Sequence, residues 1–339
     1  MNPATAAPRA PHVLVTGAAG FVGRALVARL LQAHARGTGP LARLTTIDLS
    51  AVPAAAGVPL HAVEGSIADA AVVQRAFAEP VDWVFHLASV PGGTAEQHYE
   101  LGRDVNLHGT LHLLEACAAQ VARAGGGGPV PRFVFASTVG VFGAPLPPVV
   151  DDDTSPCPAM TYGTHKLMAE AAVADFTRRG GCDGISLRLA GVLARPPAPT
   201  GQRSAFLSEL LRGPAAGREV VCPMSPEATT WASSTPNAVD NLLHAASVPA
   251  ALLPRHRALT LPALHFSMAE LIDALVARHG SAVRACVRFA PDPVVEALFG
   301  RQPPMHTPAA LAAGFCDDGD LATLLRRATE AEPPDGDTP

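Results

Sequence analysis

The segment His12–Gly23 constrains the fold more than any other part of this sequence. It begins with an apolar run typical of a buried strand, continues through Gly17, Gly20 and Gly23, and leads into a helix-like stretch. Three glycines at this spacing permit a tight turn, a close approach of the backbone to phosphate, and tight packing of the helix on the strand. The segment therefore predicts a strand–turn–helix unit that seats a dinucleotide pyrophosphate.

Strand-like and helix-like segments alternate along the first part of the chain. We expect strands at residues 12–16, 44–48, 60–64, 83–87, 132–137 and 184–189. We expect helices at residues 20–35, 70–78, 100–124 and 162–179. Alternation of this kind is typical of a mostly parallel sheet with helices on both faces, so the sequence predicts an α/β fold with a doubly wound parallel sheet.

The chain of 339 residues is long enough for one such domain and a smaller second lobe. Beyond residue 193 the strand-like runs are more widely spaced and proline becomes frequent. We therefore expect a dinucleotide-binding domain over residues 12–193 and a substrate-binding lobe, interwoven with it, over residues 194–331. Residues 1–11 are expected to be flexible and residues 332–339 to form a disordered tail.

Charge and hydropathy exclude several classes of function. A net charge of −5 offers no positive surface for nucleic acid or an anionic membrane. No apolar run approaches the roughly 18 residues that cross a bilayer, and the N-terminal residues lack the apolar centre of a signal peptide. We therefore expect a cytoplasmic protein that acts on a small molecule, with no nucleic-acid or membrane partner.

Cysteine, histidine and aspartate spacings predict no metal site. The six cysteines include no Cys-x-x-Cys pair, so we expect reduced thiols. His108 and His112 lie four residues apart on an expected helix, but no acidic residue lies between them and no third ligand is indicated. The run Asp151-Asp152-Asp153 is expected to be a solvated loop, because adjacent like charges repel one another.

Residues at the ends of the first four expected strands form the predicted cofactor site. Asp48 ends the second strand, where its carboxylate can accept hydrogen bonds from an adenosine ribose diol. Its charge repels a 2′-phosphate, and the following Leu49-Ser50 supplies no arginine for one, so NAD is favoured over NADP. The expected contacts are Gly17, Gly20, Phe21, Val22, Gly23, Asp48, Ser66, Ile67, Leu87, Ala88 and Ser89. For the segments after the third and fourth strands, an ordinary strand-end turn is the alternative.

Tyr162 and Lys166 form the predicted proton-transfer pair. Four residues apart on a helix, they project from the same face one turn from each other. A tyrosine has an ordinary pKa near 10, so it acts as a base at neutral pH only where a neighbouring ammonium stabilises its phenolate. The Lys166 ammonium can also hydrogen-bond the nicotinamide ribose, so Tyr162 and Lys166 are expected to contact the cofactor as well. Thr138, at the end of the fifth strand, is expected to orient the substrate oxygen. Each residue alone also has an ordinary structural interpretation, and the spacing and topology favour the catalytic one.

These motifs together resemble the extended short-chain dehydrogenase/reductase family, also called NAD-dependent epimerase/dehydratases. The motifs are Thr16–Gly23, Asp48, His86–Ser89, Asn106–Thr110, Ser137–Gly143 and Tyr162–Lys166. The resemblance implies a Rossmann-type domain, bound NAD, a Thr138–Tyr162–Lys166 triad and a homodimer formed through a four-helix bundle. It further implies that Asn106 braces the site and that Ala190 and Val192 lie in the segment contacting the carboxamide.

Within the family, the chain resembles members that oxidise the C2 hydroxyl of a small sugar acid such as D-erythronate. Val139-Gly140 follows Thr138 where dehydratases carry an Asp-Glu pair, so dehydration is disfavoured. Ala190 and Phe142 depart from the commoner Pro and Tyr, which leaves the substrate subclass open. The expected substrate-binding residues are Ser89, Gly93, Thr138, Tyr162, Arg195, Ser204 and Trp231. Arg195 would pair with the carboxylate, with a surface arginine as the alternative; for Trp231 the alternative is core packing.

Three functions follow from these residues. The first is NAD-dependent oxidation of a small sugar acid to its 2-oxo acid. The second is a sugar-nucleotide epimerase that uses the same triad and recycles a tightly bound NAD. The third is a non-catalytic NAD-sensing protein, against which the intact triad argues, because a sensor needs the glycine turn but no base.

Overall fold

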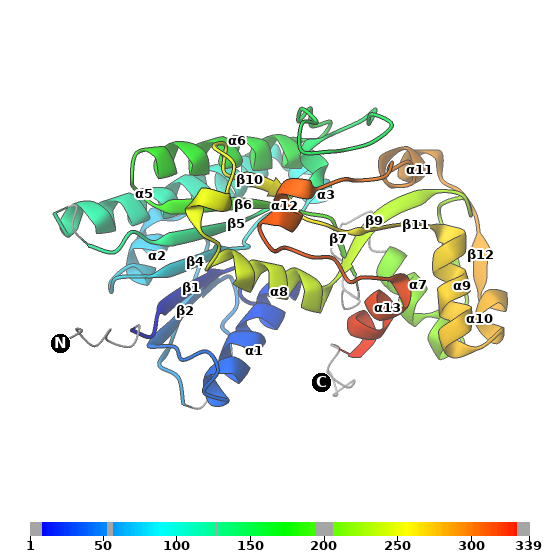
Figure 1. Cartoon of the computed structure of the whole chain (residues 1–339), viewed down its shortest axis with the longest axis horizontal. Helices are drawn as coiled ribbons and strands as arrows, with labels where there is room; N and C mark the ends of the chain where they lie inside the picture. Colours follow the sequence, from blue (N-terminus) through cyan, green and yellow to red (C-terminus); the bar gives the residue numbers. More distant parts are fainter. Residues whose placement is uncertain (1–8, 53–56, 126–127, 194–205, 331–339) are drawn as a thin grey trace.

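A seven-stranded parallel sheet forms the centre of the protein (Figure 1). The computed structural model describes residues 9–52, 57–125, 128–193 and 206–330. The strands are β1 (His12–Thr16), β2 (Arg43–Asp48), β3 (Leu60–Glu64), β4 (Trp83–His86), β5 (Arg132–Thr138), β6 (Asp183–Leu189) and β10 (Ala258–Thr260). Their spatial order is β3-β2-β1-β4-β5-β6-β10. The order reverses between β1 and β4, and the crevice beyond the carboxyl ends of the strands at such a reversal is where open α/β sheets bind ligands.

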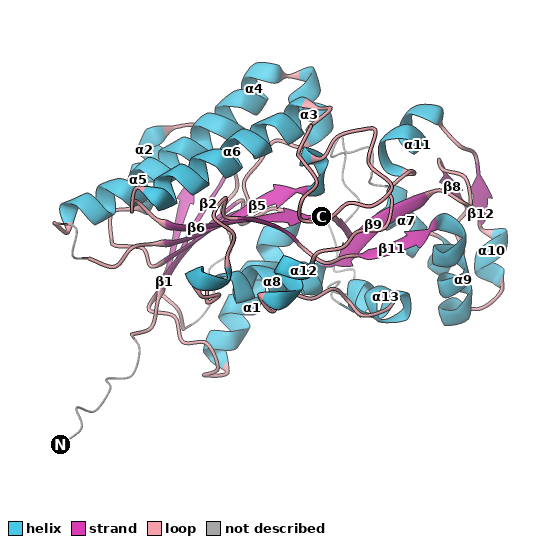
Figure 2. Ribbon diagram, turned by 45° about the horizontal axis from the view of Figure 1, so that its top comes forward, coloured by secondary structure: helices cyan, strands magenta, loops and turns pink. Residues whose placement is uncertain are grey.

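Helices cover both faces of this sheet, which explains why β1 is buried along its whole length and β5 along all but its last residue (Figure 2). The covering helices are α1 (Phe21–Ala35), α2 (Ala70–Ala76), α5 (Gly109–Arg123), α6 (Thr161–Arg178) and α8 (Thr235–Ala245). On one face, α2, α5 and α6 bury side chains such as Leu113 and Val173 against the strands. On the other, α1 and α8 bury Leu26 and Leu242. The predicted doubly wound α/β fold is confirmed.

The helix expected at residues 100–124 is present but contains a π turn. The chain is helical from Tyr99 to Arg123, as α4 (Tyr99–Arg103), the π-helical turn η1 (Asp104–His108) and α5. A further short helix that was not predicted, α3 (Gly92–Gln97), precedes it. The π turn contains the buried Asn106, whose side chain binds the backbone of Val90. The contacts between Asn106 and Val90 leave no periodic repeat in the sequence. The hydrophobic pattern, which predicts helices, could therefore not predict this π turn.

The second lobe is built on smaller sheets. Its elements are β7 (Gly191–Leu193), α7 (Phe206–Arg212), β8 (Val220–Cys222), β9 (Thr229–Ser234), β11 (Leu264–Ser267), α9 (Met268–His279), α10 (Ala282–Ala285), β12 (Val287–Phe289), α11 (Pro293–Phe299) and α13 (Leu321–Glu330). The short helix α12 (Pro308–Ala312) packs instead beside β10 of the large sheet. One sheet has the order β11-β9-β7, and β8 pairs with β12. Between these elements the chain returns to the large sheet, where it adds β10 beside β6 and packs α8 on α1. The domain boundary at residues 193/194 stays a prediction.

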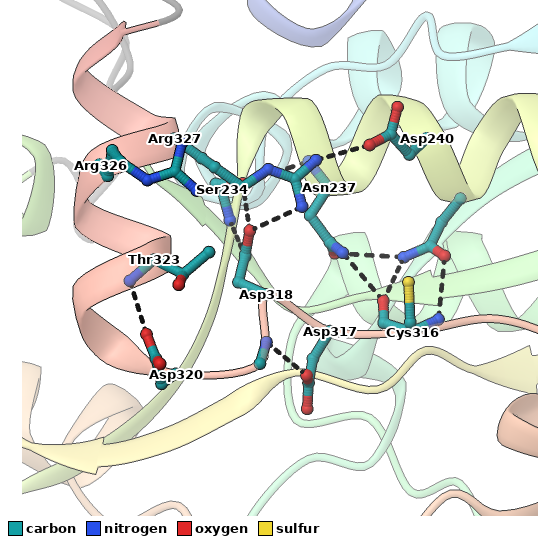
Figure 3. Close-up of polar contacts among 12 residues, drawn as sticks. Ser234, Asn237, Asp240, Cys316, Asp317, Asp318, Asp320, Thr323, Arg326 and Arg327 are labelled. Atoms are coloured by element: carbon teal, nitrogen blue, oxygen red, sulfur yellow. Dashed lines mark hydrogen bonds and ion pairs between the residues drawn. The ribbon is translucent and has the colours of Figure 1, made fainter.

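A polar cluster joins the C-terminal segment to the rest of this lobe (Figure 3). We call Ser234, Asp240, Asp318 and Arg327 the C-terminal clamp. The fully buried Asp318 carboxylate accepts hydrogen bonds from Ser234 N at 2.7 Å and Ser234 Oγ at 2.6 Å. Arg327, on α13, pairs with Asp318 at 3.3 Å and with Asp240 on α8 at 2.5 Å. The clamp therefore fixes α13 to both β9 and α8.

None of the helices in the described ranges has both the length and the apolar character needed to cross a membrane.

Candidate active site

The glycine turn after β1 has the geometry expected of a phosphate-binding turn. Gly17 has φ +69°, and a Cβ atom there would lie 2.7 Å from Ala88 N. A Cβ atom on Gly23 would lie 2.0 Å from Gly17 O, so the turn and the start of α1 admit no side chain at either position. Phe21 and Val22 open α1, whose first turn carries no acidic residue to compete with an anion. These residues fit a dinucleotide pyrophosphate.

Asp48 connects the end of β2 to this turn. Its Oδ2 accepts a hydrogen bond from Ala19 N at 2.9 Å, and its Oδ1 accepts one from Leu49 N at 2.7 Å and a longer one from Ser50 N at 3.4 Å. An ionised carboxylate accepts about four hydrogen bonds, so capacity remains for a ribose hydroxyl. The contact with the adenosine ribose itself stays a prediction.

A buried histidine holds the segment Leu87–Ser89 beside the glycine turn. His86 Nδ1 lies 2.8 Å from Thr16 Oγ1, and His86 Nε2 lies 2.8 Å from Thr110 Oγ1. Because the Thr110 hydroxyl donates to a backbone carbonyl, it accepts from His86, which assigns the imidazole proton to Nε2. Burial, with a smaller contribution from the charge of Lys166, lowers the pKa of His86 well below its ordinary value. His86 is therefore a neutral brace.

Asn106 pins the next part of the same segment. Its Oδ1 accepts from Val90 N at 2.7 Å, and its Nδ2 donates to Val90 O at 3.1 Å. The chain then enters α3, where a Cβ atom on Gly92 would lie 3.7 Å from Tyr162 Cβ. Ser89 and Gly93, both half-buried, therefore lie on a segment that reaches the catalytic tyrosine candidate. Their contacts with ligands stay predictions.

The residues after β3 are placed differently from one another. Ser66 is half-buried, and its hydroxyl oxygen accepts from Ala68 N at 3.2 Å. Ile67 is buried, and a Cβ atom on Gly109 of α5 would lie 2.6 Å from its side chain. The side chain of Ile67 therefore belongs to the core, and any contact with adenine would come from its backbone.

Tyr162 and Lys166 lie one turn apart on α6, as predicted, and α6 packs on β5. Lys166 Nζ lies 5.6 Å from the centre of the Tyr162 ring and donates a hydrogen bond to Ala136 O at 2.8 Å. A Cβ atom on Gly163 would lie 2.5 Å from Gly140 O, so the backbone of α6 packs directly against the backbone of the turn after Thr138. The structure thus brings the three triad candidates to neighbouring elements at the carboxyl edge of the sheet.

The environment of Lys166 is unusual for an ammonium group. The side chain is 2% exposed, and burial lowers the pKa of Lys166 to about 7, while the charge of Glu170 acts to raise it. Lys166 is also the only lysine in the chain, and every other basic side chain apart from histidine is arginine. This count is visible in the sequence, but the sequence analysis did not use it.

Three residues that the sequence analysis did not select form a buried network behind this pair. We call Ser137, Glu170 and Arg188 the α6 network. The Glu170 carboxylate accepts a hydrogen bond from Ser137 Oγ at 2.5 Å. It also accepts from Arg188 Nη2 at 2.8 Å and from Arg188 Nε at 3.1 and 3.2 Å. The i,i+4 spacing of Lys166 and Glu170 was the available signal, but neither Ser137 nor Arg188 is near them in the sequence.

The remaining predicted residues divide into three groups. Ala190 and Val192 are partly buried where β6 leads into β7, at the same sheet edge as Thr138, which pairs with Leu189. Trp231 is buried, and its Nε1 donates to Pro303 O at 2.6 Å, so core packing describes its observed contacts. Arg195 and Ser204 lie outside the described residues.

Comparison with known proteins identifies the family. The model of the NAD dependent epimerase/dehydratase family matches residues 13–231. The chain belongs to this family. It is 36% identical over 323 residues to the D-erythronate dehydrogenase of Cupriavidus necator, which covers 93% of this chain and 97% of that protein. It is 30% identical over 320 residues to the D-erythronate dehydrogenase of Haemophilus influenzae, covering 94% and 98%.

Solved structures agree with this fold. A nucleoside-diphosphate-sugar epimerase from Agrobacterium tumefaciens superposes with a TM-score of 0.88 at 31% identity, covering 95% of this chain and 94% of the other. A GalE-like L-threonine dehydrogenase from Cupriavidus necator, at 20% identity and a TM-score of 0.77, shares the fold over 95% of this chain and 100% of its own.

Proposed function

We propose that this protein oxidises the C2 hydroxyl of a small sugar acid, D-erythronate or a close analogue, to the 2-oxo acid with NAD. The observation that carries the proposal is the likeness to two D-erythronate dehydrogenases across both lobes. A UDP-glucose 4-epimerase of Azospirillum brasilense, by contrast, matches only 60% of the chain. The substrate lobe is the part that separates these activities, because the NAD-binding part is common to both.

The proposed mechanism assigns one task to each triad residue. The Gly17–Gly23 turn and Asp48 would hold NAD, which would supply the acceptor for the hydride leaving C2. Tyr162, as the phenolate, accepts the proton of the C2 hydroxyl. The ammonium of Lys166, one turn away on α6, stabilises that phenolate by its positive charge. Thr138 orients the reacting oxygen by a hydrogen bond.

A sugar-nucleotide epimerase is the alternative that a specific observation favours, because the Agrobacterium tumefaciens neighbour carries that name. An epimerase regenerates its NAD within each turnover. It therefore retains NAD through purification and releases no NADH.

The deciding experiment follows NADH absorbance with a panel of aldonates and uronates, erythronate and threonate included, with NAD and NADP in parallel. We expect NADH formation with a four-carbon aldonate and a preference for NAD. Tyr162→Phe should lower turnover by roughly 10² to 10⁴-fold and leave NAD affinity nearly unchanged. Stoichiometric co-purifying NAD together with silence across the panel would favour the epimerase. Silence with loosely bound NAD would favour the NAD-sensing protein.

The outer face of α4 and α6 supports the proposed homodimer through a four-helix bundle. Tyr99 and Met168 are 56% and 48% exposed, and both border a surface hollow of about 380 Å³. Large apolar side chains gathered on one face are typical of an interaction surface. Sedimentation should give twice the chain mass for the wild type and a monomer for Met168→Glu; a monomeric wild type would refute the dimer. The cytoplasmic location stays a prediction.

A further inference from the structure

The α6 network lies directly behind the proposed proton-transfer pair. Glu170 follows Lys166 by one turn of α6, and the side chains of Glu170 and Arg188 are only 4% and 8% exposed. We propose, on the basis of the proposed function, that Glu170 is a positioning residue. Held by Ser137 and Arg188, it fixes α6 on the sheet and keeps Lys166 as the ammonium that Tyr162 requires.

Consecutive residues of β5 hold α6 in position. Ala136 O accepts the hydrogen bond of Lys166, the Ser137 hydroxyl donates to Glu170, and Thr138 is the residue proposed to orient the substrate oxygen. Successive side chains of a strand point to opposite faces, so Ser137 faces α6 while Thr138 does not share that direction. Two consecutive turns of α6 are therefore fastened to two consecutive residues of β5, which sets the register between Tyr162 and Thr138.

Stability alone does not account for this ion pair. Burying two charges costs about as much solvation as their attraction returns, and apolar pairs of similar volume are often as stable or more stable. What the pair supplies is a carboxylate held in a fixed place inside the protein, one turn of α6 beyond Lys166. Ser137 and Arg188 both donate hydrogen bonds to this carboxylate.

The Glu170 carboxylate acts on Lys166. Glu170 raises the pKa of Lys166 against the effect of burial. Arg188 approaches from β6 and binds the carboxylate of Glu170. On β4, His86 is kept neutral by burial and adds no opposing charge. Glu170 is thus the acidic group that favours the ammonium form of Lys166 near neutral pH.

The single lysine of this chain permits a direct test. Lysine labelled with ¹³C at Cε gives one side-chain signal, from Lys166, whose pH titration needs neither substrate nor turnover. In the NAD-free protein and in its NAD complex, Glu170→Gln should lower the pKa of Lys166 by about one unit or more. Glu170→Gln/Arg188→Gln should lower it less, because the second change removes a neighbouring positive charge. An unchanged titration in folded Glu170→Gln would overturn the proposal.

Two further variants separate charge from fold. Asp183→Asn removes a carboxylate that pairs with Arg132 and Arg257 at the other end of β6, at 2.7 and 2.9 Å, and should leave the Lys166 titration unchanged. If Glu170→Gln does not fold, Glu170→Met/Arg188→Met keeps the volume without the charges and permits the same titration. In this double variant the pKa of Lys166 should fall below that of the wild type, and an unchanged value would again overturn the proposal.

Activity measurements then separate the two proposals. If a sugar acid is oxidised, the acid limb of kcat/KM should move to higher pH in Glu170→Gln, since a less charged Lys166 leaves the pKa of Tyr162 higher. A pH profile that does not move would contradict the positioning role. If no sugar acid reacts but the Lys166 titration shifts as expected, the proposed substrate is wrong and the role of Glu170 stands.

Discussion

The α6 network and the C-terminal clamp are built from the same parts but serve different needs. In each, a serine hydroxyl and an arginine bind one buried carboxylate. Arg188 is 8% exposed, whereas Arg327 is 23% exposed and has a second acidic partner. The α6 network also lies next to an ammonium group, that of Lys166. The contacts of the clamp among the described residues only hold α13 against β9 and α8. The comparison teaches that an acid–arginine pair gains a chemical role through its neighbours.

The largest difference between the two clusters should appear when the arginine is removed. Arg188→Met removes the cation that is hydrogen-bonded to the buried Glu170 and leaves Ser137 as its one side-chain hydrogen-bond donor, so we expect the free energy of unfolding to fall by about 3–5 kcal/mol. Arg327→Met should cost only about 1–2 kcal/mol, because Asp318 retains two hydrogen bonds from Ser234. Urea denaturation of both variants measures this. Equal losses would mean that the two arginines are equivalent.

The same experiment has an internal control. Glu170→Met/Arg188→Met should regain most of the stability lost in Arg188→Met, since no unpaired charge remains buried. If the double variant is no more stable than the single one, lost packing rather than an unpaired carboxylate explains the loss.

The next effect concerns the pH dependence of stability, which should change at Lys166 beside the α6 network and stay unchanged at the C-terminal clamp. With the pKa of Lys166 lowered to about 7 from an ordinary 10.5, the unfolded chain binds a proton between these pH values that the folded chain lacks. The contribution of Lys166 to the free energy of unfolding should therefore rise with pH above 7, by up to about 1.4 kcal/mol per pH unit. Urea denaturation of the NAD-free wild type and Lys166→Met at several pH values measures the difference. Arg327→Met should keep the wild-type slope, and a difference that falls with pH would contradict the assignment.

The smallest effects should come from deleting single hydroxyl groups. Ser137→Ala and Ser234→Ala should each lower the free energy of unfolding by about 1–2 kcal/mol, with the larger loss at Ser234, because its hydroxyl also accepts from Asn237 N and caps α8. Their kinetic effects should be reversed, with kcat lowered in Ser137→Ala and unchanged in Ser234→Ala. Equal kcat values in the two variants would remove the functional distinction between the clusters.

Local sequence patterns were sufficient for six of the seven strands of the large sheet, and the three-residue β10 was not predicted. The six predicted strands agree with β1 to β6 to within one residue at each end, because buried parallel strands are short apolar runs bounded by turns. The glycine turn was predictable for a similar reason, since each glycine meets a local steric requirement. The smaller strands were not predicted individually. β7, β8 and β12 have three residues each, too few for a period to emerge.

The candidate site was predictable only in part. The pairing of Tyr162 with Lys166 follows from helix geometry and needs no knowledge of the fold. The contacts of Glu170 with Ser137 and Arg188 join residues 33 and 18 positions apart, and no local rule connects them. The sequence left both a substrate surface and core packing open for Trp231, whose ring is buried in the structure, because whether an aromatic ring is covered depends on elements distant in the sequence.

The sequence by itself determined the α/β architecture, the family, the dinucleotide turn and the one-turn spacing of the tyrosine and the lysine. All of these depend on backbone periodicity or on side chains close together in the chain. The tertiary structure alone decided that the single lysine is buried, and that a carboxylate one turn further along the helix is bound by a serine from β5 and an arginine from β6. Burial and electrostatic environment are properties of the packed chain, since the groups that create them converge only when the sheet and its helices assemble.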